Sequence, residues 1–159
     1  MDKMTVRDAR HNDAAFIAQM IRHMVVDMAS HGGNTPATDV SAWDKIAIAV
    51  AGELKGNNVK YLVAESANGE PIGVAGAELT TLGGAFAPKK TLHISVVYVV
   101  PQLRRGGIGG RLIAELLDWG RAAGCELCDL NVLSGNPARS LYERCGFSVS
   151  EVKMVRSLV

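Results

Sequence analysis

The sequence lacks several features that define particular classes of protein. It contains no run of about eighteen apolar residues, so no helix is predicted to span a membrane. Positive and negative charges nearly cancel, with Lys and Arg at 17, Asp and Glu at 16 and a formal net charge of +1. This balance gives no general electrostatic case for binding nucleic acid or an acidic membrane surface. We therefore expect neither of these to be its partner.

An N-terminal signal segment and a disulfide framework are also missing. Met4 leads directly into strand-like residues, without the apolar stretch of a secretory signal. The cysteine count is odd, which suits a reducing compartment, so we expect a cytoplasmic protein. Cys125 and Cys128 have the spacing of one half of a zinc site, but no second half is present. Because they lie at the start of a predicted strand, we expect no metal and no redox role.

The pattern of apolar residues predicts one domain over residues 1–159, with no repeat or linker. Helices are predicted after the caps Asn12 or Asp13 and Asp39 or Ser41, after the glycines at 106–110, and over 137–144. Strands are predicted at residues 4–9, 61–64, 71–77, 91–100, 126–133 and 147 to about 156. The element order is therefore β-α-α-β-β-β-α-β-α-β, which is an α/β (α+β) fold.

The most informative stretch runs from residue 97 to 112, where an apolar strand is followed by a basic, glycine-rich loop and then a helix. A helix start carries unpaired N–H groups and a partial positive charge, so it attracts anions. Glycine lets the backbone approach an anion closely, and Arg104 and Arg105 add donors suited to phosphate oxygens. The loop therefore predicts a phosphate or pyrophosphate ligand.

Two common phosphate-binding motifs do not fit this loop. A P-loop needs Lys followed by Ser or Thr after its glycines, and no such pair follows the glycines of this loop. A dinucleotide fingerprint that begins at Gly107 would need a glycine at position 112, which is Leu112.

Two motifs together resemble the GNAT superfamily of N-acetyltransferases. The first is Arg104-x-x-Gly107-x-Gly109, which is similar to the family's coenzyme A pyrophosphate loop. The second runs from Leu130 through Asn136 and Tyr142 to Phe147 and is similar to the family's later motif. The resemblance is specific from about residue 94 to 147 and weaker before that. It implies a single-domain fold with a mixed, largely antiparallel sheet flanked by helices.

The resemblance also implies where acetyl-CoA, the co-substrate, would bind. In the family, the pantetheine arm lies along the strand before the loop, much as an added strand would. The implied pantetheine-binding residues, by their backbone, are Val97, Tyr98 and Val99; those around the pyrophosphate are Arg104, Arg105, Gly106, Gly107, Ile108, Gly109 and Gly110. Asn136 matches an asparagine that contacts the coenzyme, and it can also cap the helix that follows Pro137.

The resemblance indicates the general acid but leaves the general base open. Tyr142 matches the family's usual general acid, although packing on its helix could also explain a tyrosine there. Many relatives place a carboxylate base on the long strand, where this chain has Ser95. His93 and Glu78 could deprotonate the amine instead, but the default expectation is a chain of water molecules ordered by Ser95, Asn131 and backbone carbonyls.

The implied reaction is direct attack of a primary amine on acetyl-CoA in a ternary complex, because no matched motif supplies a cysteine acyl carrier. The acceptor stays open between small amines, amino acids, aminoglycosides, protein N-termini and lysine side chains. A catalytically idle acyl-CoA sensor is the alternative, since Ser95 replaces the carboxylate. A nucleotide-binding regulatory domain is a third hypothesis, and it predicts a preference for ATP over coenzyme A. A homodimer is an expectation only because relatives often form one.

Overall fold

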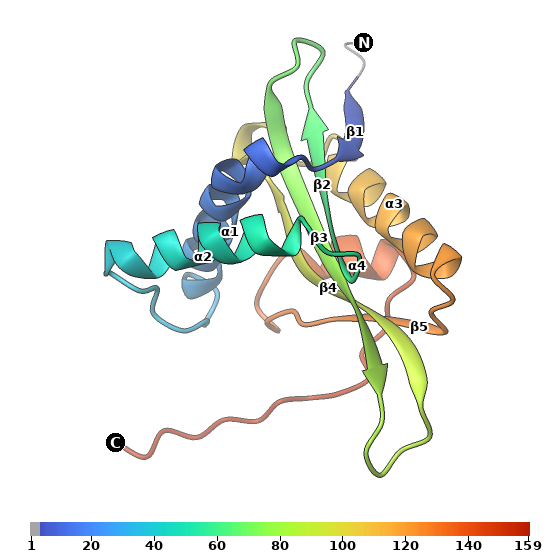
Figure 1. The fold of residues 1–159 in the computed structure, drawn as a ribbon. Helices are drawn as coiled ribbons and strands as arrows, with labels where there is room; N and C mark the ends of the chain where they lie inside the picture. Colours follow the sequence, from blue (N-terminus) through green and yellow to red (C-terminus); the bar gives the residue numbers. More distant parts are fainter. Residues whose placement is uncertain (1–3) are drawn as a thin grey trace.

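The computed structural model describes residues 4–159, and a central sheet separates two groups of helices (Figure 1). The sheet has five strands, in the order β1-β2-β3-β4-β5. The elements along the chain are β1 (Thr5–Asp8), a short 3-10 helix η1 (His11–Asp13), α1 (Ala14–Ala29), α2 (Val40–Glu53), β2 (Val59–Glu65), β3 (Pro71–Leu82), β4 (Lys89–Val99), a 3-10 helix η2 (Pro101–Leu103), α3 (Ile108–Ala122), β5 (Leu127–Leu130) and α4 (Arg139–Arg144).

The strand pairing confirms the predicted mixed, largely antiparallel sheet. The strands β1 to β4 pair antiparallel with their neighbours, and the long hairpin of β3 and β4 joins Gly73 to Val99 at one end and Leu82 to Lys89 at the other. In contrast, β5 runs parallel to β4 and pairs only from Thr91–Leu127 to Ile94–Leu130. The sheet is therefore complete on one side of β4 and short on the other.

A β-bulge interrupts β4 at Ser95. Gly76 pairs with Val96 and Ala77 pairs with Ile94, so Ser95 is the extra residue between two partners. Its hydroxyl donates a 3.3 Å hydrogen bond to the carbonyl of Gly76. Because a bulge adds one residue, side chains on either side of it no longer alternate in phase.

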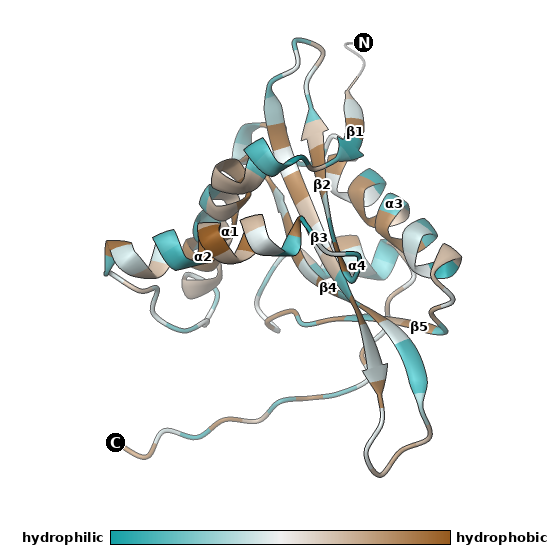
Figure 2. Ribbon diagram, viewed as in Figure 1, coloured by the Kyte–Doolittle hydropathy of each residue, from teal (hydrophilic) through white to brown (hydrophobic). Residues whose placement is uncertain are grey.

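The bulge explains how β4 serves two hydrophobic cores, which cover opposite faces of the sheet (Figure 2). Before the bulge, Leu92 and Ile94 face α3, and after it Val96 and Tyr98 face α1 and α2. The α3 core includes the fully buried Leu112, Ile113 and Leu116. Burying each such side chain stabilises the fold by roughly 1.5–3 kcal/mol.

Ion pairs hold β1 in place at the edge of the sheet that is farthest from β5. Arg7 on β1 donates to Glu65 on β2 at 2.7 Å and to both carboxylate oxygens of Asp13 at 2.7 and 3.0 Å. These hydrogen bonds from the Arg7 guanidinium hold the pKa of Asp13 below its usual value. The cluster ties β1, β2 and the start of α1 together.

Several boundaries differ from the sequence prediction. The strand β3 continues to Leu82, beyond the predicted end at residue 77. The strand β5 ends at Leu130 instead of residue 133, because β4 bends at its bulge and the parallel pairing stops beside it. The last helix begins at Arg139, after a turn in which Asn136 Oδ1 accepts from the N–H of Ala138 at 2.9 Å.

The predicted strand from 147 to about 156 does not form. Residues 148–159 run away from the body of the molecule (Figure 1), and Val152, Met154 and Val155 are 79%, 90% and 85% exposed. Neither side of this segment has a continuous apolar row, because Glu151 and Lys153 follow Val149 at strand spacing. Among residues 4–159, no helix is both long and apolar enough to cross a membrane.

Candidate active site

The site begins where β4 and β5 separate. Their last paired residues are Ile94 and Leu130, but β4 continues to Val99 while the chain leaves the sheet at Asn131. Beyond this point β4 keeps its β3 neighbour and has no strand beside its other edge in the described part of the chain. We call residues 95–99 the open edge of β4.

Backbone groups on the open edge are available for a strand-like ligand. The N–H of Val100 bonds to the carbonyl of Ile72, so residues in phase with Val100 direct their backbone groups toward β3. Val97 and Val99 are out of phase and direct theirs toward the open edge, whereas Tyr98 faces β3. Of the three predicted pantetheine residues, two therefore present backbone groups on the correct side.

The glycine loop that follows has a run of unpaired backbone donors. Arg105 and Gly107 have positive φ angles of 68° and 81°, and Gly107 is the N-cap of α3. Within residues 4–159, the N–H groups of residues 105–110 have no hydrogen-bond acceptor; the first bonded one is Arg111, to the Gly107 carbonyl. Such converging donors at a helix start form a site for an anion.

The side chain of Arg104 does not face this loop. Its Nε donates to the carbonyl of Val99 at 2.9 Å, its Nη2 donates to Asp27 on α1 at 2.7 Å, and its guanidinium lies 5.0 Å from the centre of the Tyr98 ring. Arg104 therefore connects the end of the open edge to α1. A hollow of about 270 Å³ lies beside this connection, and its lining includes Tyr98 and Asp27.

The short helix α4 lies against the start of α3. A Cβ atom at Gly109 would be 2.9 Å from Cδ2 of Leu141, so glycine permits this close approach without a shift of the Leu141 side chain. Asn136 shapes the turn before α4 through its bond to Ala138, but the N-cap of α4 is Ala138, so the predicted capping of the helix by Asn136 is wrong. The two motifs found in the sequence are therefore adjacent in space.

Tyr142 lies on the α3 side of the sheet. Its ring packs against the α3 core and makes an edge-to-face contact with Phe147, with ring centroids 6.2 Å apart. Its hydroxyl has no hydrogen-bond partner among residues 4–159. Burial, with a smaller contribution from Cys145, raises the pKa of Tyr142. The phenol therefore stays protonated at neutral pH and can donate a proton.

The candidate base residues gather on the opposite face, at the point of separation. His93 pairs with Glu78 on β3 and with Asp129 on β5, and its Nδ1 is 2.5 Å from Oδ1 of Asp129. Ser95 is exposed, two residues further along β4, and Asn131 directly follows β5. The sequence analysis did not single out Asp129, because its role depends on the register between two distant strands.

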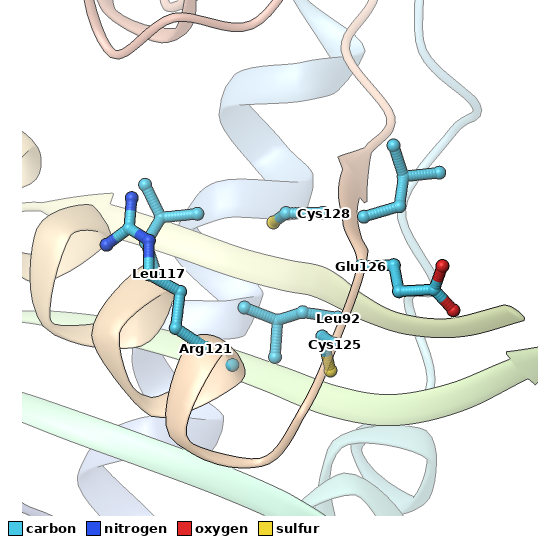
Figure 3. Close-up of a pocket in the computed structure, with 8 residues that line it drawn as sticks. Leu92, Leu117, Arg121, Cys125, Glu126 and Cys128 are labelled. Atoms are coloured by element: carbon cyan, nitrogen blue, oxygen red, sulfur yellow. The ribbon is translucent and has the colours of Figure 1, made fainter.

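The cysteine pair lies on the α3 face of the sheet, opposite the face of His93. A cavity of about 190 Å³ is lined by residues of β4, α3 and the start of β5: Leu92, Leu117, Gly120, Arg121, Cys125, Glu126, Leu127 and Cys128 (Figure 3). Burial, helped by Asp129 and Cys125, raises the pKa of Cys128 to about 12. Its thiol is therefore protonated and a poor nucleophile at neutral pH. No cluster of three or more His, Cys, Asp or Glu side chains in residues 4–159 is arranged to hold a metal ion.

Comparisons with known proteins agree with this geometry. The model of the acetyltransferase (GNAT) family matches residues 18–147. The uncharacterized N-acetyltransferase YhfO of Bacillus subtilis (strain 168) is 29% identical over 145 residues, which are 91% of this chain and 89% of that protein. Because the family model covers most of the chain, this protein belongs to the GNAT family. It is an acyltransferase of the N-acetyltransferase class.

Solved structures show the same fold at lower identity. A mutant of the BH1408 protein from Bacillus halodurans aligns with a TM-score of 0.81 at 20% identity, over 98% of this chain and 99% of that one. A predicted acetyltransferase from Clostridium acetobutylicum, solved with acetyl-CoA, aligns at 0.79 and 18% identity, over 98% and 97%. The aminoglycoside N-acetyltransferase AAC(6')-Iy, solved with CoA, aligns at 0.75 and 19% identity, over 100% and 97%.

Proposed function

We propose that this protein transfers an acetyl group from acetyl-CoA to a primary amine, by direct attack in a ternary complex. The observation that carries the proposal is the open edge of β4 leading directly into the unpaired N–H groups of residues 105–110. One molecule that needs both a strand-like partner and a pyrophosphate site is a coenzyme A thioester. Two proteins of this fold were solved with CoA or acetyl-CoA, which supports the choice.

In this proposal the pantetheine arm pairs with the backbone of Val97 and Val99. The pyrophosphate binds the N–H groups at the start of α3, where the helix dipole favours negative charge. Arg104 bonds to the carbonyl of Val99, so it limits how far along the edge the arm can pair. The thioester then lies near the separation of β4 and β5, beside Ser95 and Asn131.

The two faces of the sheet would have different roles in the reaction. The amine approaches from the face of His93, Glu78 and Ser95, and its nitrogen bonds to the carbonyl carbon. As the carbon–sulfur bond breaks, Tyr142 on the other face gives its phenolic proton to the departing thiolate. The nitrogen loses a proton as the amide forms, and this proton restores the phenol directly or through water.

The test is thiol release from acetyl-CoA in the presence of a panel of amines. The panel contains an aminoglycoside, a polyamine, an amino sugar, lysine and a peptide with a free N-terminus. Thermal unfolding with and without acetyl-CoA runs in parallel, since saturation at about 100 Kd adds about 2.7 kcal/mol to the unfolding free energy. Thiol release with one class of amine would establish the reaction and the acceptor class.

A thermal shift without thiol release would instead favour the sensor hypothesis, and a shift with ATP but not with acetyl-CoA would favour a nucleotide-binding domain. Absence of any shift with acetyl-CoA would contradict the assignment of the loop. The cytoplasmic location and the homodimer remain predictions from the sequence.

A further inference from the structure

The contact between His93 and Asp129 joins two strands next to the proposed thioester site. His93 on β4 is directly opposite Asp129 on β5, one pair before the strands separate. Their side chains are 27% and 52% exposed, and Nδ1 lies 2.5 Å from Oδ1. The pair is therefore held by the register of the sheet and is also accessible to a ligand.

This contact determines which ring nitrogen is available. A carboxylate can only accept, so Nδ1 of His93 carries the hydrogen and donates it to Asp129. The lone pair of the neutral imidazole is then on Nε2, which has no hydrogen-bond partner among residues 4–159. The arrangement leaves Nε2 able to accept a proton from a ligand.

The position of the imidazole suits the approach of an amine. Leu92 and Ile94 point into the α3 core, so His93 points to the other face, which it shares with Ser95. The titratable groups that face it across the strands are Glu78 on β3 and Asp129 on β5. Two carboxylates beside the imidazole favour a ligand that arrives with a positive charge.

We propose that His93 is the catalytic base, which removes a proton from the acceptor ammonium through Nε2, and that Asp129 is a positioning residue. The inference rests on the proposed acetyl transfer. A proton leaves the ammonium group and forms an imidazolium ion, which Asp129 stabilises and which later releases the proton to water. The neutral amine keeps its lone pair for attack. Without a base, a lysine-like amine is almost entirely protonated at pH 7.

The experiment measures kcat and KM from about pH 5.5 to 10 for the wild type, His93→Gln, Asp129→Asn and Asp129→Glu. The acceptor is the panel amine that gives the most thiol with the wild type. We expect His93→Gln to lower kcat about 100-fold at pH 7. Its KM for acetyl-CoA should stay within about twofold, and the defect should narrow as pH rises, because the amine then loses its proton unaided.

Asp129→Asn should lower kcat less, about 10-fold, because the amide cannot stabilise the imidazolium that forms when His93 takes the proton. Asp129→Glu should restore part of the rate. A purely structural contact would change the melting temperature without lowering kcat at an unchanged KM for acetyl-CoA. Two matched controls remove a histidine or a partnered carboxylate elsewhere: His11→Gln, and Asp8→Asn, which breaks a 3.0 Å pair with Lys60 on the neighbouring strand.

The outcomes separate this inference from the proposed function. If the wild type releases thiol and His93→Gln keeps its kcat and pH profile, the enzyme stands and His93 is not the base. An equal loss at every pH in His93→Gln would also overturn the inference. If the wild type binds acetyl-CoA but acetylates no amine, both the proposed base and the proposed acetyl transfer are contradicted, and the binding itself shows that the protein is folded.

Discussion

The two edges of β4 are built differently. Toward β3, the strand is paired along its whole length, from Lys89 to Val99. Toward β5, it is paired only from Thr91 to Ile94. The sequence of β4 from Thr91 to Val99 is mostly apolar or β-branched on both sides of Ser95, so composition does not explain the difference. The difference comes from the bulge at Ser95 and from where β5 ends.

The two sides of β4 are therefore expected to have different roles: the paired side stabilises the fold, and the open side is the proposed ligand-binding side. On the paired side, β1, β2 and β3 contribute residues to the two hydrophobic cores, and the ionic cluster around Arg7 lies at the far edge. The open side leaves backbone groups without partners, which costs stability unless water or a ligand satisfies them. Substitutions on the open side should therefore change catalysis or coenzyme binding, whereas those on the paired side should change stability.

The largest effect should come from Tyr142→Phe, on the open side. Removing the phenolic hydrogen takes away the proton for the thiolate, so kcat should fall about 100-fold or more. The Kd for acetyl-CoA should change less than about twofold, measured by calorimetric titration. Tyr61→Phe is the control, because it removes a buried phenol that donates to Glu53 on α2. A wild-type kcat for Tyr142→Phe would exclude it as the acid.

A smaller effect is expected from Gly107→Val, compared with Gly69→Val in the β2–β3 hairpin. Both glycines have a positive φ, 81° and 78°, and a Cβ at either would contact nothing within 4 Å. Their strain should therefore lower the melting temperature similarly. Only Gly107→Val should weaken acetyl-CoA binding, by about 10-fold or 1.4 kcal/mol. Equal binding by the two folded variants would contradict the pyrophosphate assignment.

The smallest effect should come from Asp13→Asn on the paired side. At pH 7 we expect the unfolding free energy to fall by about 1 kcal/mol, with kcat unchanged. The folded-state pKa of Asp13 is lowered, so its contribution is present above the unfolded value of about 3.9 and disappears as pH falls through the folded value. The difference between the variant and the wild type should therefore shrink near pH 3, as measured by urea unfolding.

Asp118→Asn provides the control for Asp13→Asn, because it breaks a pair with Arg121 in which both side chains are more than two thirds exposed, at 70% and 73%. Such a pair contributes little. If both variants lose stability equally, the Arg7 cluster has no special role.

Local patterns in the sequence predicted the parts of the site that depend on short segments. The loop at 104–110 was identified from its glycines and its place between a strand and a helix, and the structure has the expected unpaired donors there. The cap at Asp39 is confirmed by its bond from the N–H of Ser41. These features depend on residues only a few positions apart, so a short stretch of sequence is enough to predict them.

Features that depend on distant segments were not predicted. The orientation of Arg104 is set by Asp27, which is far away along the chain. Asp129 becomes relevant only because β5 pairs with β4 in one register. The strand expected from residue 147 had apolar residues but no continuous face, and it did not form. Composition alone does not specify the partner that a strand needs.

The bulge at Ser95 also determines how this strand tolerates insertions and deletions. Ser95 is the one residue of β4 without its own partner on β3. If it were deleted, Ile94 and Val96 would follow one another opposite Ala77 and Gly76, and the later side chains would keep their faces, because side chains alternate along a regular strand. Deletion of Val97 would instead turn Tyr98, now 7% exposed beside α1, into the α3 core and Val99 out of it. Loss of Ser95 therefore removes the bulge but leaves the contents of the two cores in place, whereas loss of a neighbouring core residue mixes them.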